Sequence, residues 1–213
     1  MSTPEDKRLN EARGFMQRRN YSQAILAYER LSRQYPHRIE IWFEYGCAAG
    51  GDGQMELADR AWRKAMELAP KNAQLMLQIG HQNRNLRRLA QARASFEQAA
   101  AADPNGINPR MALAILSEQE HRFETAREHI ASCLAIDPGD DQARYFEALL
   151  DRRQNKVEDA ERRLRDLISS EPQHQYVQYA SRYELAEVLN RTERFDEAMQ
   201  MLAEAKKLVR ALG

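Results

Sequence analysis

Cysteine and histidine side chains could supply metal ligands at two places in this chain. Cys47 and His81 are 34 residues apart, and His129 and Cys133 are four apart, about one turn of a helix. Either pair could begin a zinc site, but zinc needs three or four converging ligands, and no further ligands can be assigned. A core cysteine beside a surface histidine explains His129 and Cys133 better. We therefore expect no metal site.

Catalytic motifs are absent from the sequence. It contains no serine–histidine–acid set, no nucleophile elbow and no glycine-rich nucleotide loop. Gly50, Gly51 and Gly53 come closest to a phosphate-binding loop, but their spacing fits no nucleotide motif and no lysine directly follows. A plain turn with an unwound helix end is the simpler interpretation, because glycine favours helix ends. We expect no catalytic residues and no cofactor on this chain.

The composition limits which classes of partner and which cellular compartment are expected. The 213 residues include 32 basic and 32 acidic side chains, and the zero net charge argues against a nucleic-acid partner. No window approaches the 18 apolar residues that a membrane span needs, and the charged N-terminal residues contain no secretory signal. The two cysteines are expected to be free thiols in a reducing compartment. We predict a cytoplasmic protein with no membrane contact.

The sequence has a repeat period of 34 residues, and the repeated elements must position any functional site. Alanines recur at this interval, and prolines follow each of them after twelve residues: Ala24, Ala58, Ala92, Ala126 and Ala160, with Pro36, Pro70, Pro104, Pro138 and Pro172. The alanine lets two helices cross closely, and the proline ends the second helix. This pattern resembles the tetratricopeptide repeat family over nearly the whole chain.

The resemblance implies an all-α, right-handed solenoid of six helical hairpins, about twelve helices, in a single array over residues 1–213. The repeats are expected near residues 5–38, 39–72, 73–106, 107–140, 141–174 and 175–213. First helices are predicted near 5–17, 39–50, 73–85, 107–119, 141–153 and 175–190, and second helices near 22–34, 55–68, 89–102, 123–136, 157–170 and 195–211. Ala198 follows Ala160 by 38 residues, so the sixth repeat should begin one helical turn early, near Gln175.

In this family the first helices line an inner groove that binds peptides. Carried over position by position, the resemblance predicts a peptide-binding surface at Phe43, Leu77, His81, Met111, Ile115, Tyr145, Arg152, Tyr176 and Tyr183. An exposed apolar floor of this kind would suit an extended or helical segment with apolar anchors. The alternative is that these residues pack against neighbouring helices and fill a tight curve.

Arginines gather near the turns between paired helices, among them Arg88, Arg122, Arg153 and Arg194. They could form a basic edge for an acidic partner. The favoured alternative is that they complement the C-terminal dipoles of the first helices. Acidic residues at the starts of the second helices, Glu56, Glu124, Glu158 and Asp196, would then balance them.

The last helix suggests two further predictions. Its apolar residues would need cover, which either a homodimer formed through this helix or a longer chain would supply: the inner stripe is Ala198, Leu202, Ala205, Val209 and Leu212, with further apolar residues Met199, Met201 and Leu208. Residues 184–210 also resemble the last repeat before the catalytic domain of bacterial repeat-containing sulfotransferases. That resemblance implies an accessory region of a larger enzyme, without catalytic residues here. The leading hypothesis is a non-enzymatic scaffold that binds a protein or peptide segment.

Overall fold

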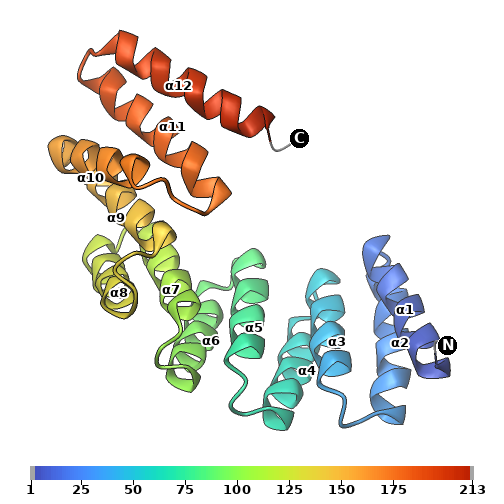
Figure 1. Cartoon of the computed structure of the whole chain (residues 1–213). Coiled ribbons are helices and arrows are strands. Elements are labelled where there is room, and N and C mark those ends of the chain that lie inside the picture. Colours follow the sequence, from blue (N-terminus) through green and yellow to red (C-terminus); the bar gives the residue numbers. More distant parts are fainter. Residues whose placement is uncertain (1–2, 212–213) are drawn as a thin grey trace. The chain divides into compact units, whose positions relative to one another are not determined.

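The computed structural model describes residues 3–211, and its described part consists of twelve helices with no strand. They are α1 (Pro4–Gln17), α2 (Tyr21–Gln34), α3 (Ile39–Gly51), α4 (Met55–Leu68), α5 (Ala73–Asn85), α6 (Leu89–Ala102), α7 (Ile107–Gln119), α8 (Phe123–Ile136), α9 (Asp141–Arg153), α10 (Val157–Ser169), α11 (Gln175–Arg191) and α12 (Phe195–Arg210). All predicted helices are confirmed, with ends within one residue of the prediction. The fold is an all-α solenoid fold of six consecutive hairpins (Figure 1).

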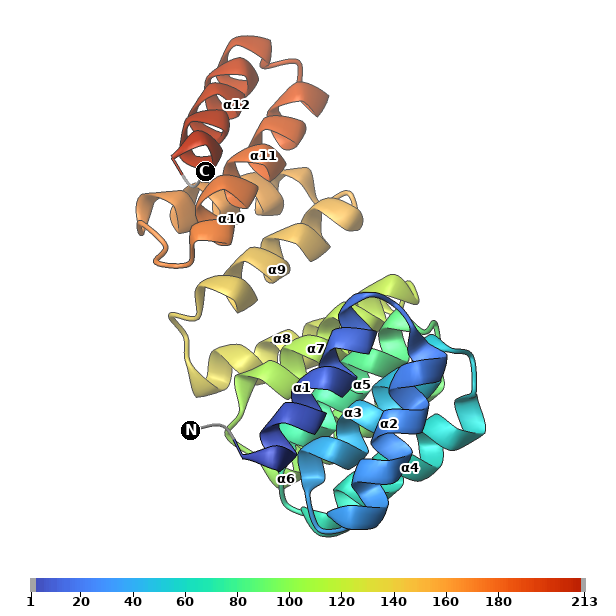
Figure 2. The ribbon, with the colours of Figure 1, turned by 90° about the vertical axis from the view of Figure 1, so that its right-hand side faces the viewer.

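The chain forms two compact units, which we describe separately. The N-terminal unit ends at Pro104 and contains α1–α6, and the C-terminal unit begins at Asn105 and contains α7–α12. In both units the two helices of a hairpin lie side by side (Figures 1 and 2). That the two units form one continuous array stays a prediction.

Glycine and aromatic side chains close the second and third hairpins of the N-terminal unit, whereas Ala12 and Tyr28 take these positions in the first. A Cβ atom on Gly46 of α3 would lie 2.3 Å from Nε1 of Trp62 in α4, and one on Gly80 of α5 would lie 2.3 Å from Phe96 in α6. Both rings are fully buried. Because the glycine leaves room for the ring, two helices can cross closely around a large side chain.

Alanine and aliphatic side chains take the same repeat positions in the C-terminal unit. Ala114 and Ile130 share one buried cluster of α7–α9, and Ala148 and Leu164 share a second cluster that includes α11. The smaller side chain at the second position leaves room for a methyl group at the first. The hairpins of the two units therefore reach similar packing with different combinations of side-chain size at the helix crossing.

The repeat period is also present in the backbone of the turns. Each hairpin turn contains one residue with φ between 56° and 83°, in the left-handed region: Arg19, Gly53, Arg87, His121, Asn155 and Glu193. These residues follow one another at the predicted interval of 34 residues, and the last follows at 38. The left-handed residue reverses the chain between the paired helices.

The glycine-rich end of α3 differs from the sequence expectation. The helix is not unwound at Gly50, since it continues to Gly51, and only Gly53 is left-handed. A Cβ on Gly50 would lie 2.9 Å from Leu86, and one on Gly51 would lie 2.6 Å from the ring of Tyr21. These two glycines therefore allow neighbouring side chains to pack against the helix backbone.

The sixth hairpin begins as the phase change predicts. Helix α11 starts at Gln175 and has 17 residues, whereas the corresponding helix α9 has 13. The added turn carries Tyr176. Among residues 3–211, no helix is long and apolar enough to cross a membrane.

Candidate functional site

In the N-terminal unit the first helices lie next to one another. Arg13 of α1 forms an ion pair with Glu44 of α3 at 2.6 Å. A cavity of about 390 Å³ lies between α3 and α5, and Phe43 lines it. The other lining residues are mainly polar or charged: Ile39, Glu40, Glu44, Asn72, Gln74, Leu75 and Gln78. Phe43 is thus a half-buried ring in a depression whose exposed surface is partly apolar.

The other two predicted residues of this unit serve its packing. Leu77 is buried, and the half-buried His81 imidazole meets the ring of Phe96 edge-on, with 5.1 Å between centroids. Burial, with a smaller contribution from Arg84, lowers the pKa of His81, which favours a neutral imidazole. Both residues offer little surface to a peptide.

The C-terminal unit carries a row of four tyrosines, which we call the tyrosine row: Tyr145 of α9 with Tyr176, Tyr179 and Tyr183 of α11. The ring centroids are 5.9 Å apart for Tyr145–Tyr176, 5.4 Å for Tyr176–Tyr179 and 6.4 Å for Tyr179–Tyr183, and all three pairs are edge-to-face. Tyr176 is 49% exposed and Tyr183 36%, whereas Tyr145 is buried at 8%. The row is an aromatic surface with a buried base.

Helical spacing explains why these rings meet. Tyr176, Tyr179 and Tyr183 are three and four residues apart, so they lie on one face of α11. The helix is held in place by its opposite stripe, where Val177, Leu185 and Leu189 are fully buried. Tyr179 is the one member that the sequence analysis missed, and its spacing from Tyr176 and Tyr183 is the signal that could have found it.

Tyr145 supports the row from below. Burial, together with the nearby Glu184 carboxylate, raises the pKa of Tyr145, so its hydroxyl stays neutral. Arg152 of α9 forms an ion pair with Glu184 of α11, and both side chains are largely covered. Because its charge is matched in this way, Arg152 is a link between α9 and α11 beside the row.

Met111 and Ile115 lie in the buried cluster of α7, α8 and α9. Met111 is buried, and Ile115 is half-buried against the same cluster. Of the nine predicted residues, the structure therefore gathers Tyr145, Arg152, Tyr176 and Tyr183 in one place, and the remaining five lie elsewhere. Their part in peptide binding stays a prediction.

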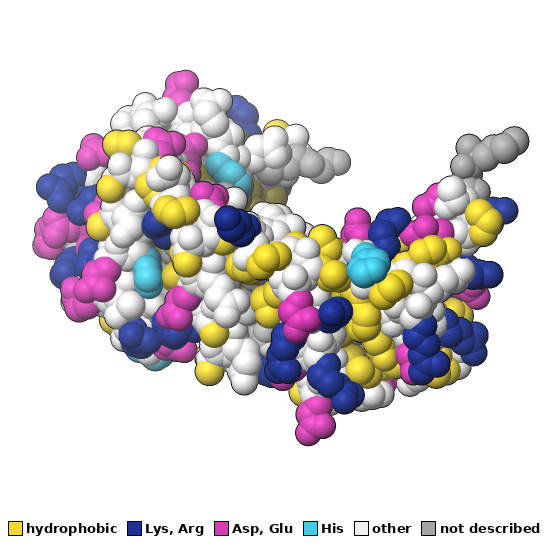
Figure 3. Space-filling model, turned by 90° about the horizontal axis from the view of Figure 1, so that it is seen from below, with side chains coloured by type: hydrophobic (Ala, Val, Ile, Leu, Met, Phe, Trp, Pro, Cys, Tyr) yellow, Lys and Arg dark blue, Asp and Glu magenta, His cyan; other side chains and the backbone are white. Residues whose placement is uncertain are grey.

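The arginines near the turns are largely matched by acids. Arg88 pairs with Asp59 at 2.7 Å, Arg153 with Glu118 at 3.2 Å, and Arg194 with Glu161 at 2.7 Å. On the face shown in Figure 3, basic and acidic side chains are interspersed. Most of these acids are not those that the sequence suggested: Glu124, for example, accepts a hydrogen bond from Gln154 at 3.2 Å.

The thiols are not arranged for metal binding. Burial raises the pKa of Cys47 to about 12 and that of Cys133 to about 11. Cys133 donates to the carbonyl oxygen of Ile107 at 3.8 Å. Within the described part of the chain, His, Cys, Asp and Glu side chains form no group of three or more that could hold a metal ion.

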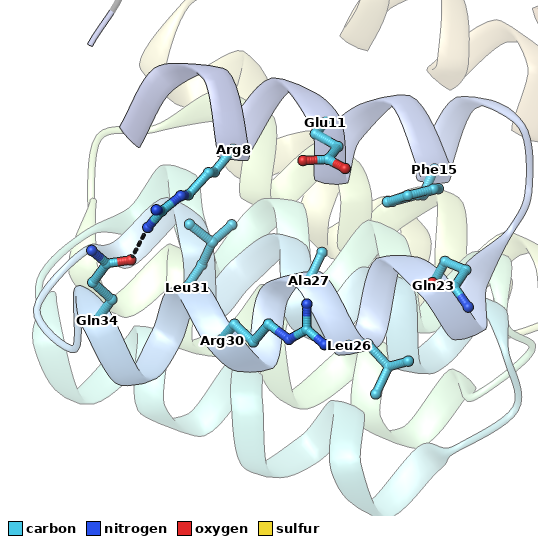
Figure 4. A pocket seen from close by; sticks show the side chains of 9 residues that line it. All are labelled: Arg8, Glu11, Phe15, Gln23, Leu26, Ala27, Arg30, Leu31 and Gln34. Atoms are coloured by element: carbon cyan, nitrogen blue, oxygen red, sulfur yellow. Dashed lines mark hydrogen bonds between the residues drawn. The ribbon is translucent and has the colours of Figure 1, made fainter. Parts of the chain in front are cut away.

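Two further cavities lie at single hairpins. The first, of about 420 Å³, lies between α1 and α2, where Arg8 donates to Gln34 at 2.7 Å and Phe15 and Leu26 supply apolar surface (Figure 4). The second, of about 470 Å³, lies between α11 and α12. Its lining is more apolar and includes Tyr183, Ala186, Glu187, Asn190, Phe195, Ala198, Met199 and Leu202.

Comparison with solved structures places this architecture among known folds. A tetratricopeptide repeat protein from Parabacteroides merdae has a TM-score of 0.70 at 14% identity, over 95% of this chain and 79% of that one. BtubC from P. vanneervenii has a TM-score of 0.68 at 15% identity, over 99% and 92%. PilW, a type IV pilus biogenesis factor, has a TM-score of 0.62 at 19% identity over the whole of both chains. No curated protein matches the chain.

Family models give the sequence-level result. Models described as tetratricopeptide repeat match residues 9–73, 73–105 and 117–182, which together are most of the chain. Nothing in these comparisons bears on the resemblance of residues 184–210 to sulfotransferase repeats, and that interpretation stays a prediction. The period, the six hairpins and the matched segments agree: this chain belongs to the tetratricopeptide repeat family.

Proposed function

We propose that this protein is an interaction scaffold, and that the tyrosine row binds a segment of a protein partner. Its support is one observation: neighbouring rings of the row stand edge-to-face, and Tyr176 and Tyr183 among them are exposed. Exposed aromatic patches on folded proteins commonly mark interaction sites. Family membership favours a scaffold, since each hairpin adds surface without needing catalytic groups.

Tyrosine suits the binding of a peptide for physical reasons. It supplies a large contact area and has only two side-chain torsions to fix, so binding costs little conformational entropy. Edge-to-face neighbours present ring faces and ring edges in alternation. This arrangement leaves shallow depressions between the rings that apolar side chains can fill. The phenolic hydroxyls can donate to and accept from the backbone of the bound segment.

The expected ligand is an extended or helical segment with apolar anchors and little net charge. Arg152, which lies beside the row, is already paired with Glu184. A strongly acidic segment would therefore gain little from the charge of Arg152. PilW, which shares the fold, is described as a type IV pilus biogenesis factor, and a scaffold role here agrees with that description.

The test uses a display library of random short peptides selected on the immobilised chain, with affinities then measured by fluorescence anisotropy. The double variant Tyr176→Ala, Tyr183→Ala should weaken the selected peptides by at least about tenfold, because aromatic anchors of an interface cost more than about 1 kcal/mol each on truncation. Tyr145 is left unchanged, since it is buried and its loss would disturb packing.

A matched control is Leu26→Ala, which truncates a similarly exposed side chain of α2 and should leave affinity unchanged. Circular dichroism should give equal helicity for all variants. Selected peptides that bind the double variant and the wild type equally would place the binding surface elsewhere.

A further inference from the structure

The outward face of α12 carries an exposed apolar stripe. Phe195 is 58% exposed, Met199 65% and Val209 42%, and Leu202 between them is half-buried. The inward face of the helix is different, since Ala198 and Ala205 are buried. In Figures 1 and 2, α11 lies against one side of α12. The sequence predicts both Leu202 and Val209 for the inner stripe; Leu202 packs partly against the core cluster, Val209 is exposed, and Leu212 lies outside the described residues.

The spacing of the stripe is that of a helix-pairing seam. Phe195, Met199, Leu202, Lys206 and Val209 follow one another by steps of four, three, four and three residues. This alternation is the a/d pattern by which two helices interlock side chains. A single lysine within such a seam is a common device that fixes register at some cost in stability.

The preceding second helix lacks this seam. In α10 the residue that corresponds to Met199 is Glu161, which pairs with Arg165 and Arg194. The residue that corresponds to Leu202 is Leu164, which is fully buried in a cluster that includes α11 residues. The exposed apolar seam is thus a property of α12 and not of the repeat.

A charged column runs beside the seam. Asp196, Ala203 and Arg210 are seven residues apart, so they lie on one side of α12, and all three are exposed. Neither Asp196 nor Arg210 makes an ion pair within residues 3–211. The column carries opposite charges at its ends and a small side chain at its centre.

Such a column is complementary to itself in one orientation only. If two copies of α12 pair antiparallel about a two-fold axis near Leu202 and Ala203, Asp196 of each copy faces Arg210 of the other. Phe195 then lies opposite Val209, and the alanine at the centre allows close approach. A parallel pair would place the two columns on opposite sides of the seam, where the charges of one copy could not meet those of the other. Self-complementarity of this kind is what a two-fold interface requires.

We propose that this face of α12 binds a second copy of the chain in an antiparallel, two-fold homodimer. The cavity of about 470 Å³ beside the seam, lined by Tyr183, Ala186 and Asn190 on its α11 side, receives apolar side chains of the partner helix. The two α12 dipoles run in opposite directions in this arrangement, which is the favourable orientation for neighbouring helices.

The first experiment measures the mass of the full chain by light scattering during size-exclusion chromatography. Run at roughly 100 μM, where a dimer with a Kd of about 10 μM is mostly assembled, the chain should have twice its mass of 24.7 kDa. Met199→Glu places a charge in the seam and should give a monomer with unchanged helicity. A wild-type chain that stays monomeric overturns the proposal, as does a Met199→Glu variant that stays dimeric.

Leu26→Glu is the matched control, because Leu26 is an exposed apolar residue at the groove between α1 and α2. It should leave the dimer intact. If the α12 face instead paired with that groove head to tail, Leu26→Glu would dissociate the assembly and the wild type would form species larger than dimers. That outcome also overturns the proposal.

Charge reversal tests the orientation. Asp196→Arg or Arg210→Asp alone should weaken association by about tenfold at low salt, because each creates two like-charge contacts. The double variant Asp196→Arg, Arg210→Asp restores both pairs and should associate like the wild type. Failure of the double variant to recover rules out the antiparallel pairing.

Discussion

The two units of this protein use aromatic side chains for opposite purposes. In the N-terminal unit Tyr28, Trp62 and Phe96 are fully buried and set the spacing of the hairpins. In the C-terminal unit aliphatic residues fill those positions, and Tyr176, Tyr183 and Phe195 are exposed. The same repeat can therefore direct its aromatic area inward, where it stabilises, or outward, where it can bind. Both candidate surfaces belong to the second kind.

One repeat position inside the hairpins carries a polar side chain in both units, but the interactions of that side chain differ. Asp151 in the C-terminal unit is 2% exposed and accepts from Arg127 at 2.6 Å and Arg163 at 2.8 Å. Asn83 takes the same repeat position in the N-terminal unit, where its Nδ2 donates to the carbonyl of Ile79 at 3.2 Å. Its Oδ1 atom is buried without a hydrogen-bond partner. One site is a satisfied ion cluster, and the other is a partly satisfied amide.

The largest expected effect comes from breaking that ion cluster. Asp151→Ala should lower the free energy of unfolding by about 2–3 kcal/mol, less than for a fully buried pair because both arginines reach solvent. Asn83→Ala should cost within about 1 kcal/mol, since it removes an unpaired carbonyl along with one weak hydrogen bond. Urea unfolding followed by circular dichroism measures both. Equal losses would remove the contrast between the two sites.

The next effect tests the tight helix crossing of the N-terminal unit. Gly80→Ala normally favours a helix, but here the new methyl group would overlap Phe96, and we expect a net loss of about 1–2 kcal/mol. Gly14→Ala is the control, because a Cβ there meets nothing closer than the Arg18 side chain at 3.5 Å, and it should stabilise α1. Trp42 and Trp62 both lie in the N-terminal unit, so tryptophan fluorescence during urea unfolding reports on it. A stabilising Gly80→Ala would contradict the packing described.

The smallest effect compares the two thiols. Burial keeps both neutral in the folded chain, with the pKa of Cys47 raised to about 12 and that of Cys133 to about 11, from 9.0. Above pH 9 the unfolded chain releases these protons while the folded chain retains them, so stability falls as pH rises. At pH 10 each thiol should account for about 1 kcal/mol of loss.

Thermal unfolding at pH 9 and pH 10 measures this loss. Cys47→Ala and Cys133→Ala should each flatten the pH dependence, although each also changes the packing at neutral pH. Above pH 11 the two should part, because the contribution of Cys133 levels off there while that of Cys47 continues towards pH 12. A pH dependence that neither substitution alters would contradict the burial of the thiols.

The sequence predicted the fold closely because the fold depends on local, repeated constraints. Ala126, for instance, marks a close helix crossing, and Pro138 prevents the helix from continuing, so both boundaries can be read from residue type and period. The phase change before the sixth repeat was predictable for the same reason, since an insertion of one helical turn preserves the faces of a helix.

The candidate site was less predictable because exposure is not a property of repeat position alone. Leu77, Met111 and Tyr145 share a position with Tyr183, yet the first three are buried and Tyr183 is exposed. How much each is covered depends on the side chains of neighbouring helices, which the period does not specify. Arg152 shows the same limit for charge, because its partner Glu184 comes from the next hairpin.

The left-handed turn residues carry a consequence for how such a chain can change over time. Five of the six are not glycine, and an L-residue held in that conformation raises the energy of its hairpin by about 1 kcal/mol. None of Arg19, Arg87, His121, Asn155 and Glu193 belongs to the tyrosine row or to the α12 seam. Relieving this strain, one hairpin at a time, would stabilise the fold. Selection or a designer could use that gain to offset mutations in the binding surfaces that destabilise the fold.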